Sequence, residues 1–358
     1  MKSSRSIVCI AATAIPCVLQ EQLYEVILVK DRYDYLPNGY QETIEKGLNA
    51  LRVFRRVSHG IGTREERLKR LKDELTNADA IVIGAGAGLS TSAGFTYSGE
   101  RFDRYFFDFR RRFGITDMYS GGFYPFPDNE TRWAWWARHI YFNRYVNPPK
   151  PVYQKLSELV KDKNYFVITT NVDHQFQRAG FDKARLFYTQ GDYGLFQSVN
   201  RKLQKTYDNE EWVYKAMEAQ GFVRDESGVF TVPEDKEIAM RIPTELIPKC
   251  PDDGSDVVMN LRSDDSFVED EGWHRASAAY CDFLKKHEND RVLYLELGVG
   301  SNTPVIIKYP FWQMTLTNDK AVYACLNYSE AYCPEEIAVQ SICIENDIGI
   351  VFNNLKSL

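Results

Sequence analysis

Short apolar runs of five or six residues are separated by longer amphipathic stretches along the central and C-terminal parts of this chain. The runs at residues 80–84, 165–170, 292–297 and 321–326 have the length and composition of buried strands. They end at Gly, Asn or Asp residues, and helical patterns lie between them. Buried strands that alternate with helices predict an α/β fold built on a doubly wound, Rossmann-like parallel sheet.

The helical patterns have recognisable ends. Thr63 and Glu66 have the spacing of a capping box at the start of the first helix. Aromatic and basic residues alternate along residues 101–113, which predicts a helix that packs its rings beneath an arginine-rich face. The tryptophan-rich helix after it is expected to be core. Helices are predicted at residues 63–76, 101–113, 133–142 and 152–162.

The predicted strands also divide the chain. Residues 63–358 form the predicted α/β domain, with a helical insertion at about 96–149 and a small polar insertion at about 199–286. Residues 1–62 form an N-terminal extension of unknown role. Its apolar run after Lys2 and Arg5 is too short for a membrane span and leaves a signal peptide, a transit segment or a private extension open. We expect a cytoplasmic protein, with no membrane partner.

Composition narrows the class of partner. The chain has 358 residues, 44% of them hydrophobic and 26% charged, as in an ordinary globular protein. Its net charge of −6 argues against a broad basic surface for nucleic acid. The seven cysteines are scattered without a framework spacing, which predicts reduced, mostly core-filling thiols.

A cluster of glycines directly follows the first predicted strand. Glycines at a strand-to-helix turn allow the backbone to approach a diphosphate, whose charge is met by N–H groups and the helix dipole. A purely steric glycine turn is the alternative. The candidate cofactor-binding residues of this segment are Gly84, Ala85, Gly86, Gly88 and Ser90.

The other predicted strands also end in candidate site residues. Asn171 and Asp173 follow the second strand, at the edge where open parallel sheets bind ligands. An Asx-turn with a helix cap is the alternative for this pair. The third strand is followed by Gly298, Gly300 and Ser301, which could also form only a tight turn, and the fourth by Asn327.

Four motifs in this order resemble those of the sirtuins, a family that consumes NAD. The glycine loop resembles the sirtuin Gly-Ala-Gly segment, and residues 170–173 resemble Gln-Asn-Ile-Asp. Residues 298–301 resemble the Gly-Thr-Ser loop, and residues 326–327 the Ile-Asn that follows it. The resemblance covers residues 64–355 and implies NAD as co-substrate.

Several positions depart from the usual sirtuin pattern. Gln190 stands where sirtuins have the catalytic histidine, and residues 95–102 differ from the usual cofactor loop. The two CxxC pairs for structural zinc are missing, with only Cys250 and Asp253 resembling one half-pair. Because structural zinc takes four ligands that are mostly thiolates, we predict no metal site.

The departures, together with the run at residues 260–272, resemble the macrodomain-linked, or class M, sirtuins of microbes. That resemblance implies a protein ADP-ribosyltransferase whose acceptor is a lipoylated carrier similar to the glycine-cleavage H protein, acting in an oxidative-stress response. It also implies a linked macrodomain hydrolase as a partner. The acidic part of the run could touch the acceptor. Lysine deacylation, NAD hydrolysis and NAD sensing remain the alternatives.

The same resemblance assigns roles at the reactive end. Asp173 would hold the nicotinamide amide, and Asn171 would orient the ribose hydroxyls or a nucleophile. Gln190 cannot take up a proton near neutral pH, so we expect deacylation to be crippled while transfer to a carboxylate acceptor remains possible. His174 is left out of the predicted site, because neighbouring residues in a loop are expected to point apart.

Overall fold

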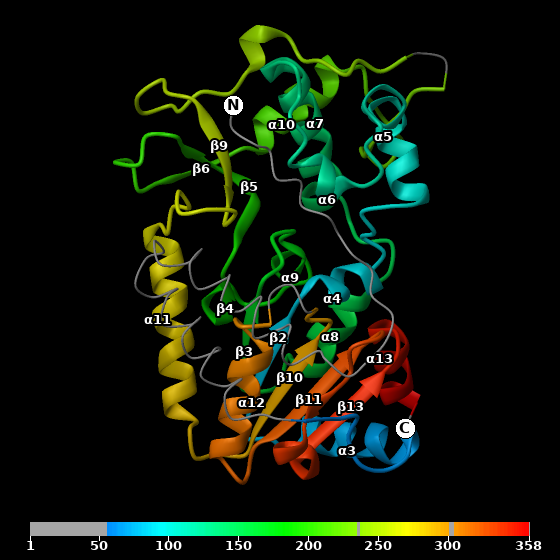
Figure 1. Ribbon diagram of the computed structural model, residues 1–358, viewed down its shortest axis with the longest axis vertical. Helices are drawn as coiled ribbons and strands as arrows, with labels where there is room; N and C mark the ends of the chain where they lie inside the picture. Colours follow the sequence, from blue (N-terminus) through cyan, green and yellow to red (C-terminus); the bar gives the residue numbers. More distant parts are fainter. Residues whose placement is uncertain (1–55, 235–236, 301–303, 358) are drawn as a thin grey trace, which may run out of the picture.

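The structure, a computed structural model, describes residues 56–234, 237–300 and 304–357. Two lobes are visible in Figure 1: a large α/β lobe that contains both described ends, and a smaller lobe of helices and short strands. Most of the predicted N-terminal extension, and with it the short apolar run, lies outside the described residues. So does Ser301. The described end of the extension forms β1, Val57–Ser58, which pairs with β12, Cys333–Pro334, in an antiparallel two-stranded sheet.

The large lobe is built on a six-stranded parallel sheet, as the sequence predicts. Its order is β13-β11-β10-β2-β3-β4, so successive strands run outward from β2 in one direction and then outward from β10 in the other. The four predicted strands are confirmed, and the sequence pattern did not reveal the two short edge strands. The bounds are β2 Ala80–Ala85, β3 Tyr165–Thr169, β4 Leu186–Tyr188, β10 Val292–Leu297, β11 Val322–Asn327 and β13 Ser341–Glu345.

Helices cover both faces of this sheet because side chains alternate along each buried strand. Ala80 and Val82 of β2 belong to one apolar cluster, and Ile81 and Ile83 belong to another on the opposite face. The first cluster packs against α11 Glu271–Lys286 and α12 Lys308–Thr317. The second packs against α3 Arg64–Asn77, α4 Ala87–Ser92, α8 Val152–Val160 and α13 Ile348–Ser357.

The predicted capping box is present at the start of α3. The Thr63 hydroxyl accepts the N–H of Glu66 at 3.3 Å, and the Glu66 carboxylate accepts the N–H of Thr63 at 2.7 Å. These bonds lower the pKa of Glu66 and satisfy two N–H groups that the first helical turn leaves without an intrahelical partner.

The two predicted insertions meet in the smaller lobe and share one aromatic core. Trp133 and Trp135 are buried there, which confirms the prediction that the tryptophan helix is core. The first insertion contributes α5 Glu100–Phe113, α6 Met118–Gly121, α7 Asn129–Ile140 and the π-helical turn η1 Tyr141–Tyr145. The chain after β4 contributes β5 Gly191–Ser198, β6 Thr206–Asp208, α10 Glu210–Ala219, β7 Val223–Arg224, β8 Phe230–Thr231 and β9 Val257–Leu261.

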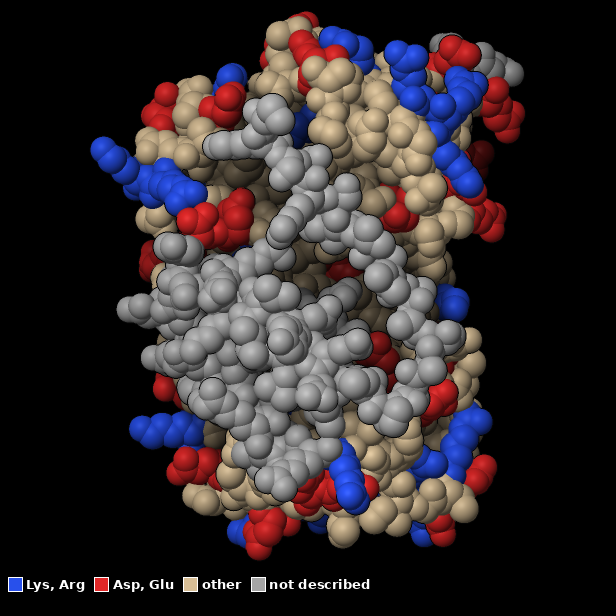
Figure 2. All heavy atoms as spheres, in the orientation of Figure 1, with Lys and Arg blue, Asp and Glu red and all other residues tan. Residues whose placement is uncertain are grey.

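Charged side chains of both signs are distributed over the face drawn in Figure 2. On α5, the three arginines at positions 110–112 are exposed while Phe102, Phe106 and Phe109 are buried, so the predicted arginine-rich face is confirmed. Among the described cysteines, those at 250, 325, 333 and 343 are buried and Cys281 is exposed, and all five are free thiols. None of the described helices has the length and apolar character needed to cross a membrane.

Candidate functional site

The two glycine loops meet at the carboxyl edge of the sheet, between β2 and β10, where the strand order changes direction. Gly86 donates its N–H to the Leu297 carbonyl at 3.0 Å, and Gly88 donates to the Gly298 carbonyl at 2.9 Å. A Cβ on Gly88 would lie 2.7 Å from the Cα of Gly298, which itself has φ +64°. Glycine is therefore required for the close approach of the two loops at the point where doubly wound sheets bind dinucleotides. Both of these N–H groups are engaged by carbonyls at the end of β10 and just after it, contrary to the expectation that they are open to a diphosphate.

The other predicted cofactor-binding residues lie around this junction. Ala85 ends β2 and is fully buried, and Asn327 ends β11 and donates to the Val299 carbonyl at 3.1 Å. Gly300 faces open space at the position where a Cβ would stand. Gly84 lies within β2, where a Cβ would stand 2.3 Å from Ile307, so its small size serves the packing of the chain just before α12. Ser301 lies outside the described residues.

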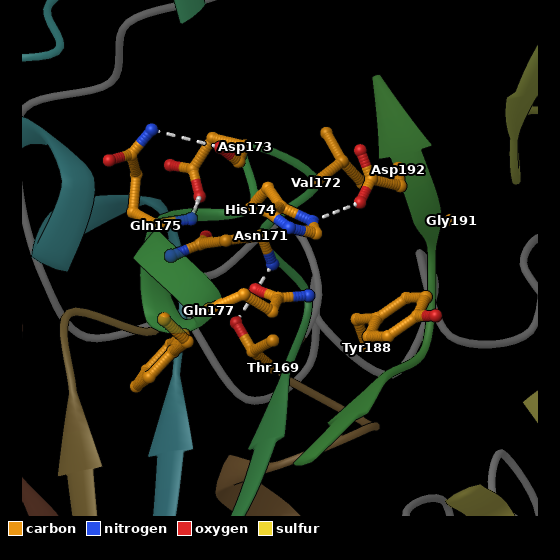
Figure 3. A pocket seen from close by; sticks show the side chains of 11 residues that line it. Thr169, Asn171, Val172, Asp173, His174, Gln175, Gln177, Tyr188, Gly191 and Asp192 are labelled. Carbon is orange, nitrogen blue, oxygen red and sulfur yellow. Dashed lines mark hydrogen bonds and ion pairs between the residues drawn. The ribbon is translucent and has the colours of Figure 1, made fainter. Parts of the chain in front are cut away.

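A buried hydrogen-bond network joins Asn171 and Asp173, which Figure 3 shows in the loop after β3. The Asn171 amide donates to the Gly86 carbonyl at 3.0 Å and to the Tyr153 hydroxyl at 3.2 Å. Tyr153 contacts Ser90 at 2.8 Å, and Ser90 donates to the Asp173 carboxylate at 2.5 Å. The network fixes Asn171 and Asp173 side by side, and it places Ser90 at this end of the site.

The orientation of the Asn171 amide follows from its partners. The Gly86 carbonyl can only accept, so the atom that faces it must be the amide nitrogen. With both N–H bonds used on Gly86 and Tyr153, the carbonyl oxygen is the atom left to accept a hydrogen bond from a ligand hydroxyl.

Burial also changes the acidity of Asp173. Loss of hydration raises the pKa of this carboxyl to about 6, although hydrogen bonds from Ser90 and from the Gln175 N–H lower it. A carboxyl of this kind is protonated well above the usual range of aspartate. The ionised Asp173 carboxylate therefore lowers the stability of the folded state at neutral pH. Such a buried charge is typical of a residue that binds a ligand.

A buried cluster of aromatic and basic groups lies in the smaller lobe, near enough to Asp173 for that carboxyl to act electrostatically on Tyr97. Tyr97 and Tyr193 share a hydroxyl–hydroxyl bond of 2.8 Å, and burial raises the pKa of Tyr97 to about 12. His139 packs against both rings, and burial lowers its pKa to about 3, so it is a neutral group here. Burial also lowers the pKa of Arg101 to about 10, and its guanidinium donates to Asn143 and lies over the Phe95 ring.

Gln190 lies in the turn between β4 and β5. Its side-chain amide nitrogen is 3.5 Å from the Thr189 hydroxyl, and its main-chain carbonyl accepts the main-chain N–H of Arg262 at 3.0 Å. A Cβ on the next residue, Gly191, would stand 1.9 Å from the Asn260 carbonyl. The run at residues 260–272 thus packs directly against the Gln190 turn. Tyr188 and Gly191 line the pocket in Figure 3, and Gln190 is not one of its lining residues.

His174 is the site residue that sequence reasoning excluded. Figure 3 shows its ring in the pocket, facing Asp192, with Nδ1 at 2.6 Å from the Asp192 carboxylate. It has φ +62°, the one left-handed non-glycine residue in the described chain. This backbone turns the side chain toward β5, against the expectation that it points away from the site. The Asn-Val-Asp-His sequence contains no signal for that turn.

Asp192 is held from several directions. It accepts Nε of Arg144 at 2.9 Å and the Gly194 N–H at 2.7 Å as well as the imidazole. Burial alone would raise the pKa of Asp192, but the bond from His174 and the charge of Arg144 outweigh it and lower the pKa. The pocket therefore holds an ionised carboxylate behind a histidine ring.

The arrangement presents polar groups that can bind a glycosidic substrate. The described residues contain no group of three or more His, Cys, Asp and Glu side chains placed to bind a metal ion. They do place a hydroxyl acceptor, a buried carboxyl and an imidazole around one pocket beside two closely packed glycine loops. Such groups can position a ribose and a leaving group and exclude water from them.

Two known proteins are similar to this chain over most of its length. A protein ADP-ribosyltransferase of Staphylococcus aureus is 37% identical over 280 residues, which cover 78% of this chain and 84% of that protein. A probable bifunctional ADP-ribose hydrolase/ADP-ribosyltransferase of Fusarium oxysporum is 29% identical, and the match covers 80% of this chain but 47% of that longer protein. A solved Sir2 mutant with a p53 peptide and NAD has the same fold, with a TM-score of 0.50, 18% identity, and coverage of 81% of this chain and 97% of that chain. No protein-family model matches the chain.

Proposed function

Because this chain belongs to the sirtuin-type protein ADP-ribosyltransferases, we propose that it transfers ADP-ribose from NAD to a lipoylated carrier protein similar to the glycine-cleavage H protein. Nicotinamide is the other product. The setting we propose is an oxidative-stress response, with a macrodomain hydrolase as the enzyme that reverses the modification. The bifunctional name of the fungal relative supports the pairing of the two activities.

The observation that carries the transferase reaction is the joined network of Asn171 and Asp173 beside the glycine loops. Cleavage of the nicotinamide–ribose bond gives the ribose carbon oxocarbenium character, so the reaction depends on fixed positions for the ribose and for the leaving amide. The Asn171 carbonyl oxygen would accept a ribose hydroxyl. Asp173, buried and bonded to Ser90, would accept the amide N–H of nicotinamide.

Gln190 favours transfer over lysine deacylation. In a deacylase, a base activates a ribose hydroxyl against the acyl intermediate, and a glutamine amide does not accept a proton near neutral pH. Bond cleavage at the ribose carbon itself requires no base at this position. The Gln190 turn, whose main-chain carbonyl accepts the Arg262 N–H, would therefore take no part in proton transfer.

The test is transfer of label from NAD to the carrier protein, in lipoylated and unmodified forms side by side, with an acylated lysine peptide in parallel. We expect label on the lipoylated carrier alone. Equal labelling of both carriers would contradict the lipoyl requirement, and deacylated peptide would contradict the role of Gln190. Consumption of NAD without protein label would identify a hydrolase instead.

A further inference from the structure

Two large aromatic side chains are exposed on α6 and the turn that follows it. Tyr119 is 63% exposed and Phe123 is 66% exposed, and their rings meet edge to face with centroids 5.3 Å apart. Aromatic rings are among the side chains that gain most from burial, because water solvates them poorly. Contiguous exposed apolar surface of this kind is typical of a binding site.

Phe123 also forms one side of a groove between α6 and α7. The groove has a volume of about 570 Å³ and is lined by residues 122–129 and Arg132. Pro125 and Pro127 are exposed along it, so the apolar surface continues from the aromatic pair into the groove. We refer to Tyr119, residues 122–129 and Arg132 together as the aromatic ledge.

The aromatic ledge is held in place by buried contacts and by a helix cap. A Cβ on Gly121 would lie 2.0 Å from the Trp135 ring, so glycine is required for the turn to lie directly on α7. Asp117 caps α6 by accepting the Ser120 N–H at 2.8 Å. The exposed rings are therefore presented by a turn that the fold fixes.

The aromatic ledge adjoins the candidate site. Met118, the residue before Tyr119, donates its N–H to the Tyr97 carbonyl at 2.8 Å. Burial raises the pKa of Tyr97, and the nearby Asp173 and Tyr119 side chains raise it further. Figure 1 shows α6 on the side of the smaller lobe that faces the large lobe. A group bound on the ledge therefore lies beside the end of the site where Asp173 is placed.

Arginines without carboxylate partners flank the ledge. In the part of the chain that the structure describes, Arg111, Arg112 and Arg132 form no ion pair. Arg132 lines the groove itself, and the other two are exposed at the end of α5. The next residue of α5, Phe113, connects this end to the groove, since its ring contacts that of Phe126 with centroids 5.6 Å apart.

The carboxylates of this region are already engaged. Asp128 accepts Nη1 of Arg241 at 2.5 Å, and Glu130 accepts the Thr244 hydroxyl at 2.8 Å. Figure 2 shows basic side chains over α5, although the chain as a whole has a net charge of −6. The surface is therefore complementary to a partner that presents an apolar group next to acidic side chains.

We propose that the aromatic ledge docks the acceptor protein, with an apolar arm of that protein on Tyr119 and Phe123 and its acidic side chains on the arginines. The inference rests on the proposed function, because the lipoyl group of the carrier is such an arm, a long uncharged chain joined to the protein through an amide. Docking of the arm brings the carrier surface beside Asp173. The lipoyl group then acts in recognition and takes no part in bond cleavage.

The experiment measures transfer to the lipoylated carrier by the full-length chain and by Phe123→Ala and Arg132→Gln. Val339→Ala and Arg64→Gln are the matched controls, since both positions are exposed in the large lobe, on the turn Glu335–Gln340 and at the start of α3. We expect KM for the carrier to rise about tenfold in each ledge variant, because aromatic and arginine anchors carry much of the affinity of an interface. We expect kcat and KM for NAD to stay unchanged, and both controls to keep the wild-type constants.

Lipoamide provides a probe of the arm without the carrier. It should compete with the lipoylated carrier and not with NAD, and Phe123→Ala should weaken this competition about tenfold. An unchanged KM for the carrier in both ledge variants would overturn the proposal, as would equal changes in the controls or a fall in kcat alone. Aromatic and arginine side chains also bind single-stranded nucleic acid. An RNA oligonucleotide that displaces the carrier from wild type and not from Phe123→Ala would assign the ledge to nucleic acid and overturn the docking of a protein.

Failure of the proposed function gives a different pattern. If the wild-type chain labels no carrier, the proposed reaction is wrong, and the ledge is then tested by calorimetric titration with lipoylated and unmodified carrier. Tighter binding of the lipoylated form by wild type, lost in Phe123→Ala and kept in Val339→Ala, would support the docking surface. Equal binding of the two carriers, or equal binding by wild type and Phe123→Ala, would overturn it.

Discussion

Strand β3 has a histidine–aspartate pair beyond each of its ends, and the two pairs have nearly the same Nδ1-to-carboxylate distance. At the carboxyl end His174 meets Asp192 in the pocket, and at the amino end His287 meets Asp290 beside Asn164. They differ in the second ring nitrogen, which Asn164 engages only at the amino end, and in the burial of the carboxylate. The Asp192 side chain is 6% exposed and that of Asp290 is 45% exposed. The presence of a histidine–aspartate pair is therefore weak evidence for a function. Its position on the sheet and the hydrogen-bond partners of the second ring nitrogen are more informative.

The largest difference expected between the two ends is in stability. Asp192→Ala leaves the charge of Arg144, whose side chain is 13% exposed, without its buried partner, and we expect a loss of about 3–5 kcal/mol. Asp290→Ala should cost less than about 1 kcal/mol, because that carboxylate is half exposed. Urea unfolding of the two variants checks this, and equal losses would show that the ends are energetically alike.

Asparagines flank β3 and allow the same comparison for activity. Asn171→Ala removes the group that we propose binds the ribose, and we expect transfer to fall about a hundredfold or more. Asn164→Ala removes the contact with His287 at the other end and should leave turnover nearly unchanged. Single-turnover transfer of labelled ADP-ribose, with a melting curve for each variant, is the measurement. A fall in Asn164→Ala as large as that in Asn171→Ala would argue for a global effect of either change.

The raised pKa of Asp173 predicts how the stability of the protein depends on pH. Its folded pKa of about 6 lies above the unfolded value near 3.9, so the folded state binds the proton more tightly. The ionised carboxylate therefore lowers stability as pH rises through this window, and the loss is complete above pH 6. We expect Asp173→Asn to be more stable than wild type by about 2 kcal/mol at pH 8 and no more stable at pH 4, and to be inactive. Thermal melting at the two pH values decides it, and an equal effect at both would contradict the raised pKa.

Much of the fold could be predicted from the sequence, because its signals are local. The apolar runs at β2, β3, β10 and β11 are buried on both faces, and such runs are recognisable without any knowledge of their neighbours. β4 has three residues, and β13 lies between the 3₁₀ turn Glu335–Gln340 and α13, where the sequence pattern is ambiguous. The positions of β4 and β13 in the sheet depend on which strands they pair with, and the sequence pattern does not show this pairing.

The candidate site also has parts that the sequence predicted and parts that it did not. Asn171 and Asp173 were predicted because a parallel strand presents the residues after its carboxyl end at a known edge. Ser90 was predicted as part of the cofactor loop, and the structure also bonds its hydroxyl to Asp173. Their roles toward NAD, and that of Gln190, remain predictions.

The sequence by itself determined the fold class, which follows from hydrophobic periodicity, and indicated the family through four short motifs that resemble those of the sirtuins, because each of these signals is local. Only the tertiary structure decided that Gly86 and Gly88 pack against Gly298 and that His174 faces Asp192. The first depends on strands that are more than two hundred residues apart in the chain meeting at the switch in strand order. The second depends on one left-handed backbone angle and on a carboxylate from another element, and neither is encoded in the local pattern.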